Sequence, residues 1–178
     1  DSSSQKKFLI SNNIVSHERS TVLLHGSVGG VNTKKFKYKK TTRDLLRKKL
    51  QISKNDFTFL YLGRMNRDKG IIDLIKAFQK IKNFHNIILV LVGPIEDEYI
   101  KNFIKKNKKV IYVGETLNPE KWFSMADILC LPSYREGFGS VVIEAGSCNL
   151  PTLGSNIYGI TDAIVKNQTG FLHKVGSI

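Results

Sequence analysis

The chain has 178 residues and a formal net charge of +13. A chain of this length buries about 70% of its unfolded surface on folding, so its core needs neither a disulfide nor a metal ion. Hydrophobic residues make up 41% and charged residues 24%, which excludes a disordered or collagen-like chain. No apolar run reaches the roughly 20 residues of a membrane helix, and two cysteines in apolar surroundings indicate a reducing, cytoplasmic compartment. The opening Asp-Ser-Ser-Ser leads us to expect a piece of a longer protein.

Short apolar runs alternate with helical patterns along the chain. Strands that alternate with helices at this spacing form βαβ units, so we predict an α/β fold with a Rossmann-like, doubly wound parallel sheet. In chain order the predicted elements are a connecting segment (1–20), a strand (21–25), a basic helix from Thr41 or Thr42 to about Gln51, a strand (57–63), a helix (71–81), a strand (86–93), a helix (98–106), a strand (109–113), a helix that starts at Asn118, a strand (127–131), a helix from 139–140 to before Pro151, a strand (152–154), a helix (161–165) and a strand (171–173).

Local patterns support the predicted basic helix. Thr41 or Thr42 can cap its first turn, because a threonine hydroxyl accepts a hydrogen bond from a free amide there. Leu45, Leu46 and Leu50 follow at helical spacing and form its expected apolar side.

Positive charge is concentrated in the first part of the chain. Residues 1–110 hold 24 lysines and arginines against nine acids, whereas residues 111–178 hold four against six. The densest stretch, 34–54, holds ten basic residues and one acid. Three interpretations are open: a solvated surface, a surface that faces an anionic lipid or substrate, and a nucleic-acid site. The last would need a known module and more aromatic residues than Phe36 and Tyr38.

The loop after the strand 57–63 is a candidate anion site. Its sequence GRMNRDKG (63–70) holds three cations and two glycines and ends at a predicted helix. In a doubly wound sheet, ligands bind beyond the carboxyl ends of the strands, where the strand order reverses. Arg64 and Lys69 are therefore candidate phosphate ligands, and Gly70 lets the chain turn into the helix. A solvent-exposed polar turn is the alternative interpretation.

The loop PSYREGFGS (132–140) follows the strand 127–131 and leads into another helix. Free amides at the start of that helix suit an anion. Glu136 in the loop and Glu144 in the helix can face one pocket, where their carboxylates would accept hydrogen bonds from a polyhydroxylated ligand. The chain has seven glutamates, so this spacing alone also arises by chance.

Together these motifs resemble the nucleotide-binding half of retaining glycosyltransferases with the GT-B fold, often called group 1 or family 4. The resemblance covers roughly 22–173 and implies that 21–178 is a nucleotide-sugar donor-binding domain, the single C-terminal half of a GT-B fold. It also implies that the N-terminal acceptor domain and the terminal helices lie outside this sequence. It rests on LGRMNRDKG (62–70), LVGP (91–94) and ADILCLPSYREGFGSVVIEA (126–145), with VLLHGSVGGVNTKKF (22–36) and PTLGSNIYGITDAIVKNQTGFL (151–172) on either side.

The resemblance implies roles for individual residues. Arg64 and Lys69 would neutralise the donor's diphosphate, and Glu136 would contact the transferred sugar; these three are the expected catalytic residues. Glu144 would bind the ribose hydroxyls. The remaining donor-binding positions would contribute backbone, with the nucleobase near Val113 and Gly114 and the sugar and phosphate near Gly63, Gly137, Phe138, Gly139 and Ser140.

For the whole enzyme, the resemblance implies transfer of a sugar from a nucleotide diphosphate sugar to a polysaccharide, lipid-linked or glycolipid acceptor, with retention of configuration. Bacterial capsule and lipopolysaccharide biosynthesis are the expected settings. No metal or other cofactor is expected. The expected partners are the nucleotide sugar and the N-terminal domain of the same enzyme, without nucleic acid. An additional candidate partner is the cytoplasmic membrane, through peripheral contact with its anionic inner face. The fragment alone is expected to be inactive.

Other functions remain open from the sequence. One is a different sugar-nucleotide enzyme with a GT-B-like fold, such as an epimerase or a phosphorylase. The other is a basic module that binds nucleic acid or lipid through residues 34–54. Binding that falls steeply with salt and ignores nucleoside diphosphates would favour this module.

Overall fold

The computed structural model describes residues 2–27, 29–81 and 83–177. Asp1, Val28, Lys82 and Ile178 fall within segments discussed above and lie outside the described residues. Within the described part, six parallel strands form one sheet in the order β3-β2-β1-β4-β5-β6. They are β1 (Phe57–Leu62), β2 (Ile87–Val92), β3 (Val110–Gly114), β4 (Ile128–Leu131), β5 (Thr152–Ser155) and β6 (Gly170–His173).

The strand order reverses direction at one point in the sheet. From β1 the chain adds β2 and β3 on one side, and from β4 it adds β5 and β6 on the other. The sheet therefore has its switch point between β1 and β4, which pair directly. This arrangement confirms the predicted Rossmann-like, doubly wound parallel sheet.

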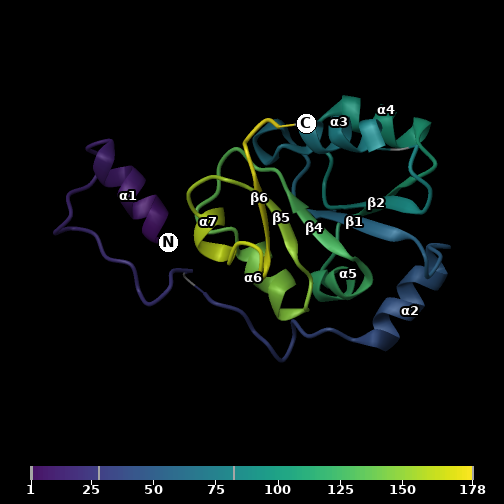
Figure 1. Cartoon of the computed structure of the whole chain (residues 1–178), viewed down its shortest axis with the longest axis horizontal. Coiled ribbons are helices and arrows are strands. Elements are labelled where there is room, and N and C mark those ends of the chain that lie inside the picture. The colour runs from purple at the N-terminus through teal and green to yellow at the C-terminus, as the bar shows by residue number, and fades with distance from the viewer. Residues whose placement is uncertain (1, 28, 82, 178) are drawn as a thin grey trace.

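Helices cover both faces of the sheet (Figure 1). The face bearing α3 (Ile71–Ile81) and α4 (Glu98–Lys106) has one apolar core, and the face bearing α5 (Pro119–Met125) and α6 (Ser140–Ser147) has another. Alternate residues of β1 enter the two cores, because side chains of a strand point to opposite faces in turn. The other helical elements are α1 (Ser3–Ser11), α2 (Lys40–Lys49), the short 3₁₀ turn η1 (Arg67–Lys69) and α7 (Ile160–Ala163).

The most strongly patterned segments fold as predicted. In β2, every residue from Leu89 to Val92 is fully buried, as expected for an unbroken apolar run covered on both faces. In α3, the predicted apolar stripe buries Ile71, Ile75 and Phe78. The helices predicted at 71–81 and 98–106 have those bounds in the structure.

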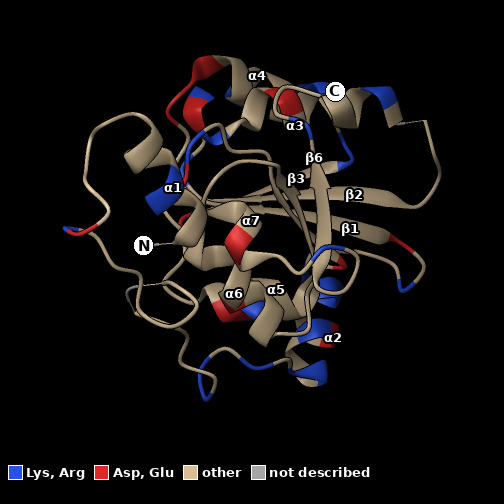
Figure 2. Cartoon of the chain, turned by 60° about the vertical axis from the view of Figure 1, so that its left-hand side comes forward, with Lys and Arg blue, Asp and Glu red and all other residues tan. Residues whose placement is uncertain are grey.

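The basic stretch 34–54 forms α2 and the segment that leads into it, where Figure 2 shows a concentration of lysines and arginines. Two of its arginines point inward instead of to solvent. Arg43 donates to Asp127 at 2.6 Å, and the buried Arg47 donates to the other oxygen of Asp127 at 3.4 Å. Asp127 also accepts from the backbone amide of Thr58 at 2.7 Å. These contacts join α2 to the starts of β1 and β4.

Several predicted local features are wrong. Residues 21–25 form no strand; Leu23 and Leu24 are 77% and 95% exposed and do not pair with the sheet. The helix α2 begins at Lys40 after Lys39 at the N-cap, so neither Thr41 nor Thr42 caps it.

Other differences concern helix ends and faces. Leu45 is 67% exposed, because the inward face of α2 is formed by Arg43, Leu46, Arg47 and Leu50. Asn118 precedes α5 as predicted, but its side chain makes no capping hydrogen bond. The predicted helix 161–165 is α7, which begins at Ile160 and ends at Ala163. The segment 1–20, predicted only as a connection, contains α1.

The two cysteines, Cys130 and Cys148, are free thiols buried in the core. Burial raises the pKa of the Cys130 thiol to about 12 and that of Cys148 to about 11. Among the described residues, every helix is too short or too polar to cross a bilayer.

Candidate active site

Two loops meet at the switch point of the sheet. Residues 63–70 follow β1, residues 132–140 follow β4, and their parent strands are neighbours. The amide of Tyr134 donates to the carbonyl oxygen of Asp68 at 2.9 Å. At Gly70, φ is +66°, and a Cβ placed there would lie 1.9 Å from the Pro132 carbonyl oxygen. Only glycine allows this close approach of the two loops.

The approach brings together two side chains that were predicted as site residues. Lys69 Nζ lies 2.7 Å from Glu136 Oε1, and their side chains are 24% and 15% exposed. The Ser133 hydroxyl donates to the same carboxylate oxygen at 3.0 Å. Asn66 caps η1 by accepting from the Lys69 amide at 3.1 Å, which fixes the lysine's backbone. The result is a positioned ion pair at the carboxyl end of the sheet.

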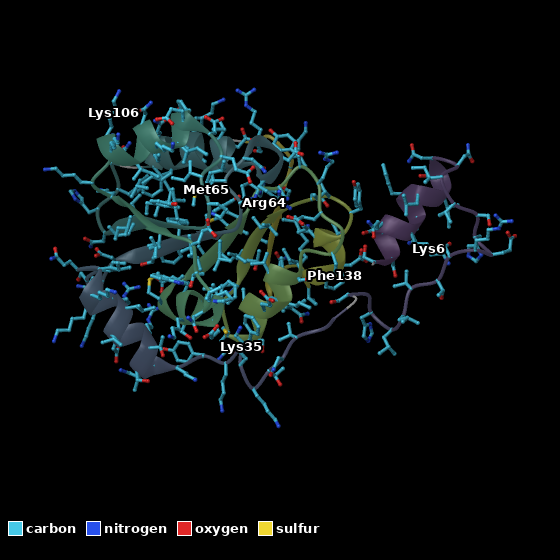
Figure 3. All side chains as sticks on the ribbon, turned by 180° about the vertical axis from the view of Figure 1, so that it is seen from behind. Lys6, Lys35, Arg64, Met65, Lys106 and Phe138 are labelled. Atoms are coloured by element: carbon cyan, nitrogen blue, oxygen red, sulfur yellow. The ribbon has the colours of Figure 1, made fainter. Side chains whose placement is uncertain are left out.

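A cleft of about 540 Å³ opens beside this pair. Eight of the eleven predicted site residues line it: Gly63, Lys69, Glu136, Gly137, Phe138, Gly139, Ser140 and Glu144. Figure 3 labels one residue from each loop, Arg64 and Phe138, and both lie on the side of the sheet towards α1. Phe138 as a whole is only 8% exposed, so it adds little accessible surface to the cleft.

The helix α6 starts at this cleft. Gly139 is its N-cap, with φ at +72°, and no side chain caps it. The first amides of a helix have no partner within the helix, and the helix dipole adds partial positive charge there. Backbone donors and Lys69 therefore border the same space, which suits an anionic group.

Glu144 lies on the next turn of α6 and also lines the cleft. It accepts no hydrogen bond from any residue of the described ranges. Burial raises its pKa, and the charge of Lys35 opposes that rise. Its carboxylate is therefore available to accept hydrogen bonds from a ligand.

Arg64 lies outside this cleft, in an adjoining hollow of about 230 Å³ that shares Leu62 and Gly63 with it. Its exposed side chain has no hydrogen bond or ion pair within the part of the chain that the structure describes. Its carbonyl oxygen accepts from the buried Tyr61 hydroxyl at 2.7 Å, which anchors the loop. Burial raises the Tyr61 pKa, and the negative charge of Glu136 adds to this effect. Arg64 is therefore free to turn towards an anion.

Val113 and Gly114 end β3 and line neither hollow. The Gly114 carbonyl accepts from the amide of Gly93 at 2.8 Å, so this part of the backbone serves the sheet. Their neighbours Glu115 and Thr116 line the hollow that contains Arg64. The structure thus brings together the predicted phosphate and sugar residues but does not place Val113 and Gly114 with them.

Seven residues in or beside the cleft were not predicted as site residues, and three of them, Leu62, Leu131 and Val141, are apolar residues that line it. Tyr61, Pro119 and Gly29 line it, and Ser133 holds Glu136. Gly29 lies in the glycine pair of residues 22–36, where a close backbone approach could have been suspected. Pro119 was interpreted only as a helix start, and nothing in the sequence separates Tyr61 from other core residues.

A larger hollow of about 910 Å³ lies beside the starts of α3 and α4. Its charged groups are largely satisfied within the protein: Arg67 pairs with Asp97 at 3.8 Å, and Arg135 pairs with Asp68. The smaller cleft is the better candidate because Glu144 and the amides of Ser140 and Val141 have no hydrogen-bond partner among the described residues. No group of three or more potential metal ligands gathers anywhere in residues 2–27, 29–81 and 83–177.

Comparison with known proteins identifies the family of the chain. The sequence pattern described as "Glycosyl transferases group 1" matches residues 42–178. The chain belongs to the group 1 glycosyl transferases. It is 31% identical, over 98% of its length, to the capsular polysaccharide biosynthesis glycosyltransferase CapM of Staphylococcus aureus, and covers 47% of that protein. It is 30% identical, over 75% of its length, to a lipopolysaccharide 1,2-N-acetylglucosaminetransferase of Salmonella typhimurium, and covers 39% of it.

Solved structures show the same fold for this member of the group 1 family. HepE of Anabaena, in its complex with UDP-glucose, matches with a TM-score of 0.83 at 22% identity, over 99% of this chain and 50% of HepE. WaaG, a glycosyltransferase involved in lipopolysaccharide biosynthesis, matches with a TM-score of 0.79 at 22% identity, over 97% and 48% of the two chains. The chain thus spans about half the length of CapM, HepE and WaaG.

Proposed function

We propose that this chain binds the donor of a glycosyltransferase, a nucleotide diphosphate sugar, in the cleft at the switch point. The observation that carries the proposal is the Lys69–Glu136 pair, at 2.7 Å, next to the free start of α6. A diphosphate needs cationic and amide donors, whereas a sugar needs hydrogen-bond acceptors. The cleft holds both kinds of group side by side.

The proposed division of labour follows the position of each group. Lys69, the first amides of α6 and a reoriented Arg64 bind the diphosphate. Glu136 accepts hydrogen bonds from the transferred sugar, and Glu144 from the ribose. Negative charge grows on the leaving phosphate oxygen during transfer, so preorganised donors there lower the barrier to reaction. Because these cations meet the diphosphate directly, the reaction is proposed to need no metal or other cofactor.

A second part of the proposal concerns the acceptor and the stereochemistry of the whole enzyme. An N-terminal domain supplies the acceptor, which is a polysaccharide, lipid-linked or glycolipid chain, and the anomeric configuration is retained. The half-length matches to full relatives support a second domain. The capsule and lipopolysaccharide relatives support the acceptor class. A cytoplasmic site of action follows from the nucleotide-sugar donor.

Calorimetry with UDP, GDP and ADP, each with and without EDTA, tests donor binding and the need for a metal. We expect one nucleotide to bind in both conditions. Lys69→Ala should weaken that binding, whereas Lys76→Ala, an exposed lysine on α3 outside the cleft, should not. Binding by none of the three nucleotides would contradict the proposal. Product analysis by NMR with the whole enzyme then separates retaining transfer from epimerisation or phosphorolysis.

We further propose that exposed lysines in and around α2 contact an anionic membrane. This basic face consists of Lys34, Lys37, Lys39, Lys48, Lys49 and Lys54, all exposed. Both arginines of the stretch are engaged inside the fold, so the face offers lysine charge without the planar arginine fork that suits nucleic acid. Leu45 is 67% exposed on the same helix and can enter a lipid surface.

Co-sedimentation with phosphatidylcholine vesicles, with and without phosphatidylglycerol, tests the basic face. We expect binding only to the anionic vesicles, with a loss of roughly thirtyfold or more in Lys48→Glu/Lys49→Glu, since each lysine near such a surface contributes about 1 kcal/mol. The matched control is Lys105→Glu/Lys106→Glu in the last turn of α4, which carries the same charge change elsewhere. Leu45→Ser should also weaken binding. Equal binding to single-stranded RNA, unaffected by Leu45→Ser, would contradict a membrane role.

A further inference from the structure

The helix α1 lies apart from the sheet and contacts the rest of the fold near α7 (Figure 1). Described residues between α1 and α2 form no helix or strand, so a long irregular segment joins α1 to the domain. None of the nine residues of α1 is buried. The helix is therefore held by a small number of surface contacts and can be released more easily than the core helices.

Ser4 makes the central polar contact of α1. Its hydroxyl donates to Asp162 Oδ2, and its amide donates to the same oxygen at 3.0 Å. The hydroxyl oxygen also accepts from the amide of Gly159 at 2.8 Å. One turn further along α1, the ring of Phe8 stacks on Tyr158, with ring centroids 4.6 Å apart. Ser4 thus bonds Gly159 near the start and Asp162 at the end of the 158–162 segment.

Asp162 is well suited to accept both hydrogen bonds from Ser4. Burial acts to raise its pKa, but hydrogen bonds from Ser4 and Ser2 and the charge of Lys7 outweigh this and lower it. The carboxylate is therefore ionised at neutral pH. An ionised acceptor makes stronger hydrogen bonds than a neutral one.

Gly159 links this contact to the candidate active site. Its φ is +82°, and a Cβ placed there would lie 2.6 Å from the Gly137 carbonyl oxygen and 2.7 Å from that of Glu136. The Gly159 backbone therefore packs directly against the turn that carries Glu136. Ile160, the next residue, is fully buried and packs with Leu131 below that turn. A shift of Gly159 would therefore remove backbone packing that supports the turn.

We propose that docking of α1 through Ser4 and Asp162 holds the turn 136–139 in its binding geometry, so that both residues are positioning residues of the donor-sugar site. The statement that the turn binds a sugar rests on the proposed function; the mechanical link from α1 to the turn does not. Release of α1 would free the Gly159 amide and loosen the turn. Movement of α1 would in this way control how firmly the sugar is held.

Amide hydrogen exchange of the full chain tests the link without any ligand. Two protected amides report on the turn: Tyr134, bonded to Asp68, and Val142, bonded to Gly139. In Ser4→Ala we expect both to exchange about threefold faster or more, because local opening becomes easier. Ser4→Thr, which keeps the hydroxyl, should restore the exchange rates of the unaltered chain. The matched control is Ser11→Ala, whose hydroxyl donates to the Phe8 carbonyl and accepts from the Asn12 side chain, both local contacts at the end of α1.

Two results would overturn the proposal. One is unchanged exchange at Tyr134 and Val142 while the amides of α1 exchange faster. The other is a uniform increase that includes β1 and β2, which would reflect lower global stability. Asp162→Ala breaks the contact from the opposite side and should give the same local pattern if Ser4→Ala does not fold.

A binding measurement then separates this proposal from the proposed function. In titrations with UDP and UDP-glucose, Ser4→Ala should weaken binding of the nucleotide sugar several-fold more than that of the nucleotide. Failure of the unaltered chain to bind UDP, GDP or ADP would contradict the proposed function and leave the exchange result standing. Equal weakening of UDP and UDP-glucose would show that Ser4 does not act through the sugar end of the site.

Discussion

Lys69 and Glu136 form an ion pair that joins loops from two neighbouring strands, β1 and β4. Each side chain is less than one quarter exposed, and Ser133 donates to the same carboxylate oxygen. Because Glu136 already neutralises much of the Lys69 charge, Lys69 alone offers an incoming diphosphate less than a full positive charge. Arg64 at the adjoining hollow, whose side chain has no partner among the described residues, can supply the additional positive charge.

The first prediction concerns these two cations. Lys69→Ala and Arg64→Ala should each raise the Kd for the bound nucleoside diphosphate roughly tenfold or more, since a hydrogen bond to a charged group contributes about 1.5–3 kcal/mol. In the whole enzyme, each should reduce turnover by orders of magnitude. Calorimetry and steady-state kinetics measure the two effects. Less than a few-fold loss at both positions would refute the assignment.

The second prediction compares two glycines. Gly70→Ala should lower the free energy of unfolding by about 1–3 kcal/mol, because φ is +66° and the new methyl group would meet the Pro132 carbonyl. Gly146→Ala, in α6 with open space around it, should raise that free energy by about 0.5–1 kcal/mol. Urea unfolding measures both. Similar changes at the two positions would show that the loop contact does not constrain Gly70.

The third prediction tests the buried arginine. Asp127→Ala leaves Arg47 without its carboxylate partner, and loss of one member of a buried pair costs about 3 kcal/mol or more. Thermal and urea unfolding should both show this loss. Asp44→Ala removes an exposed acid that pairs with Lys40, so it should leave stability nearly unchanged. A small effect at Asp127 would mean that the carbonyl groups around Arg47 suffice to hold it.

The fourth prediction is a pH dependence. Burial raises the pKa of Glu144 in the folded state, so the folded protein holds this proton more tightly than the unfolded chain. The stability that protonation contributes is present below the unfolded pKa and is lost as pH rises through the folded pKa. Glu144→Gln should therefore raise the Tm at pH 7 and change it little at pH 4. The same variant should bind nucleotide more weakly, and an unchanged affinity would contradict contact with the ribose.

Helices and strands could be predicted best from the sequence where the apolar residues of a segment followed one regular spacing. The helix α3 and the strand β2 follow directly from apolar spacing, and the alternation of such segments was enough to predict the parallel sheet. The loops with Arg64, Lys69 and Glu136 could be identified because ligands of this fold bind beyond strand ends. These predictions depend on local patterns or on topology alone.

Contacts between distant residues could not be predicted in this way. Arg47 has the pattern of a surface residue, yet Asp127, 80 positions away, holds it in the core. The contact of Ser4 with Asp162 spans 158 positions, and the polar sequence around Ser4 gives no sign of it. The strand predicted at Leu23 and Leu24 is wrong for the opposite reason. The run is locally apolar, but it does not lie beside a strand with which it could pair.

The two buried thiols have a practical consequence for following α1. Thiol reagents attack the thiolate, and both native thiols are inaccessible and have raised pKa values, so they should react slowly. A cysteine introduced at the exposed Ser11 would therefore take a maleimide dye at one defined position. The sequence has one tryptophan, Trp122 in α5, which provides an intrinsic energy-transfer donor. The distance between the two could be followed in real time without removing any native side chain from the core.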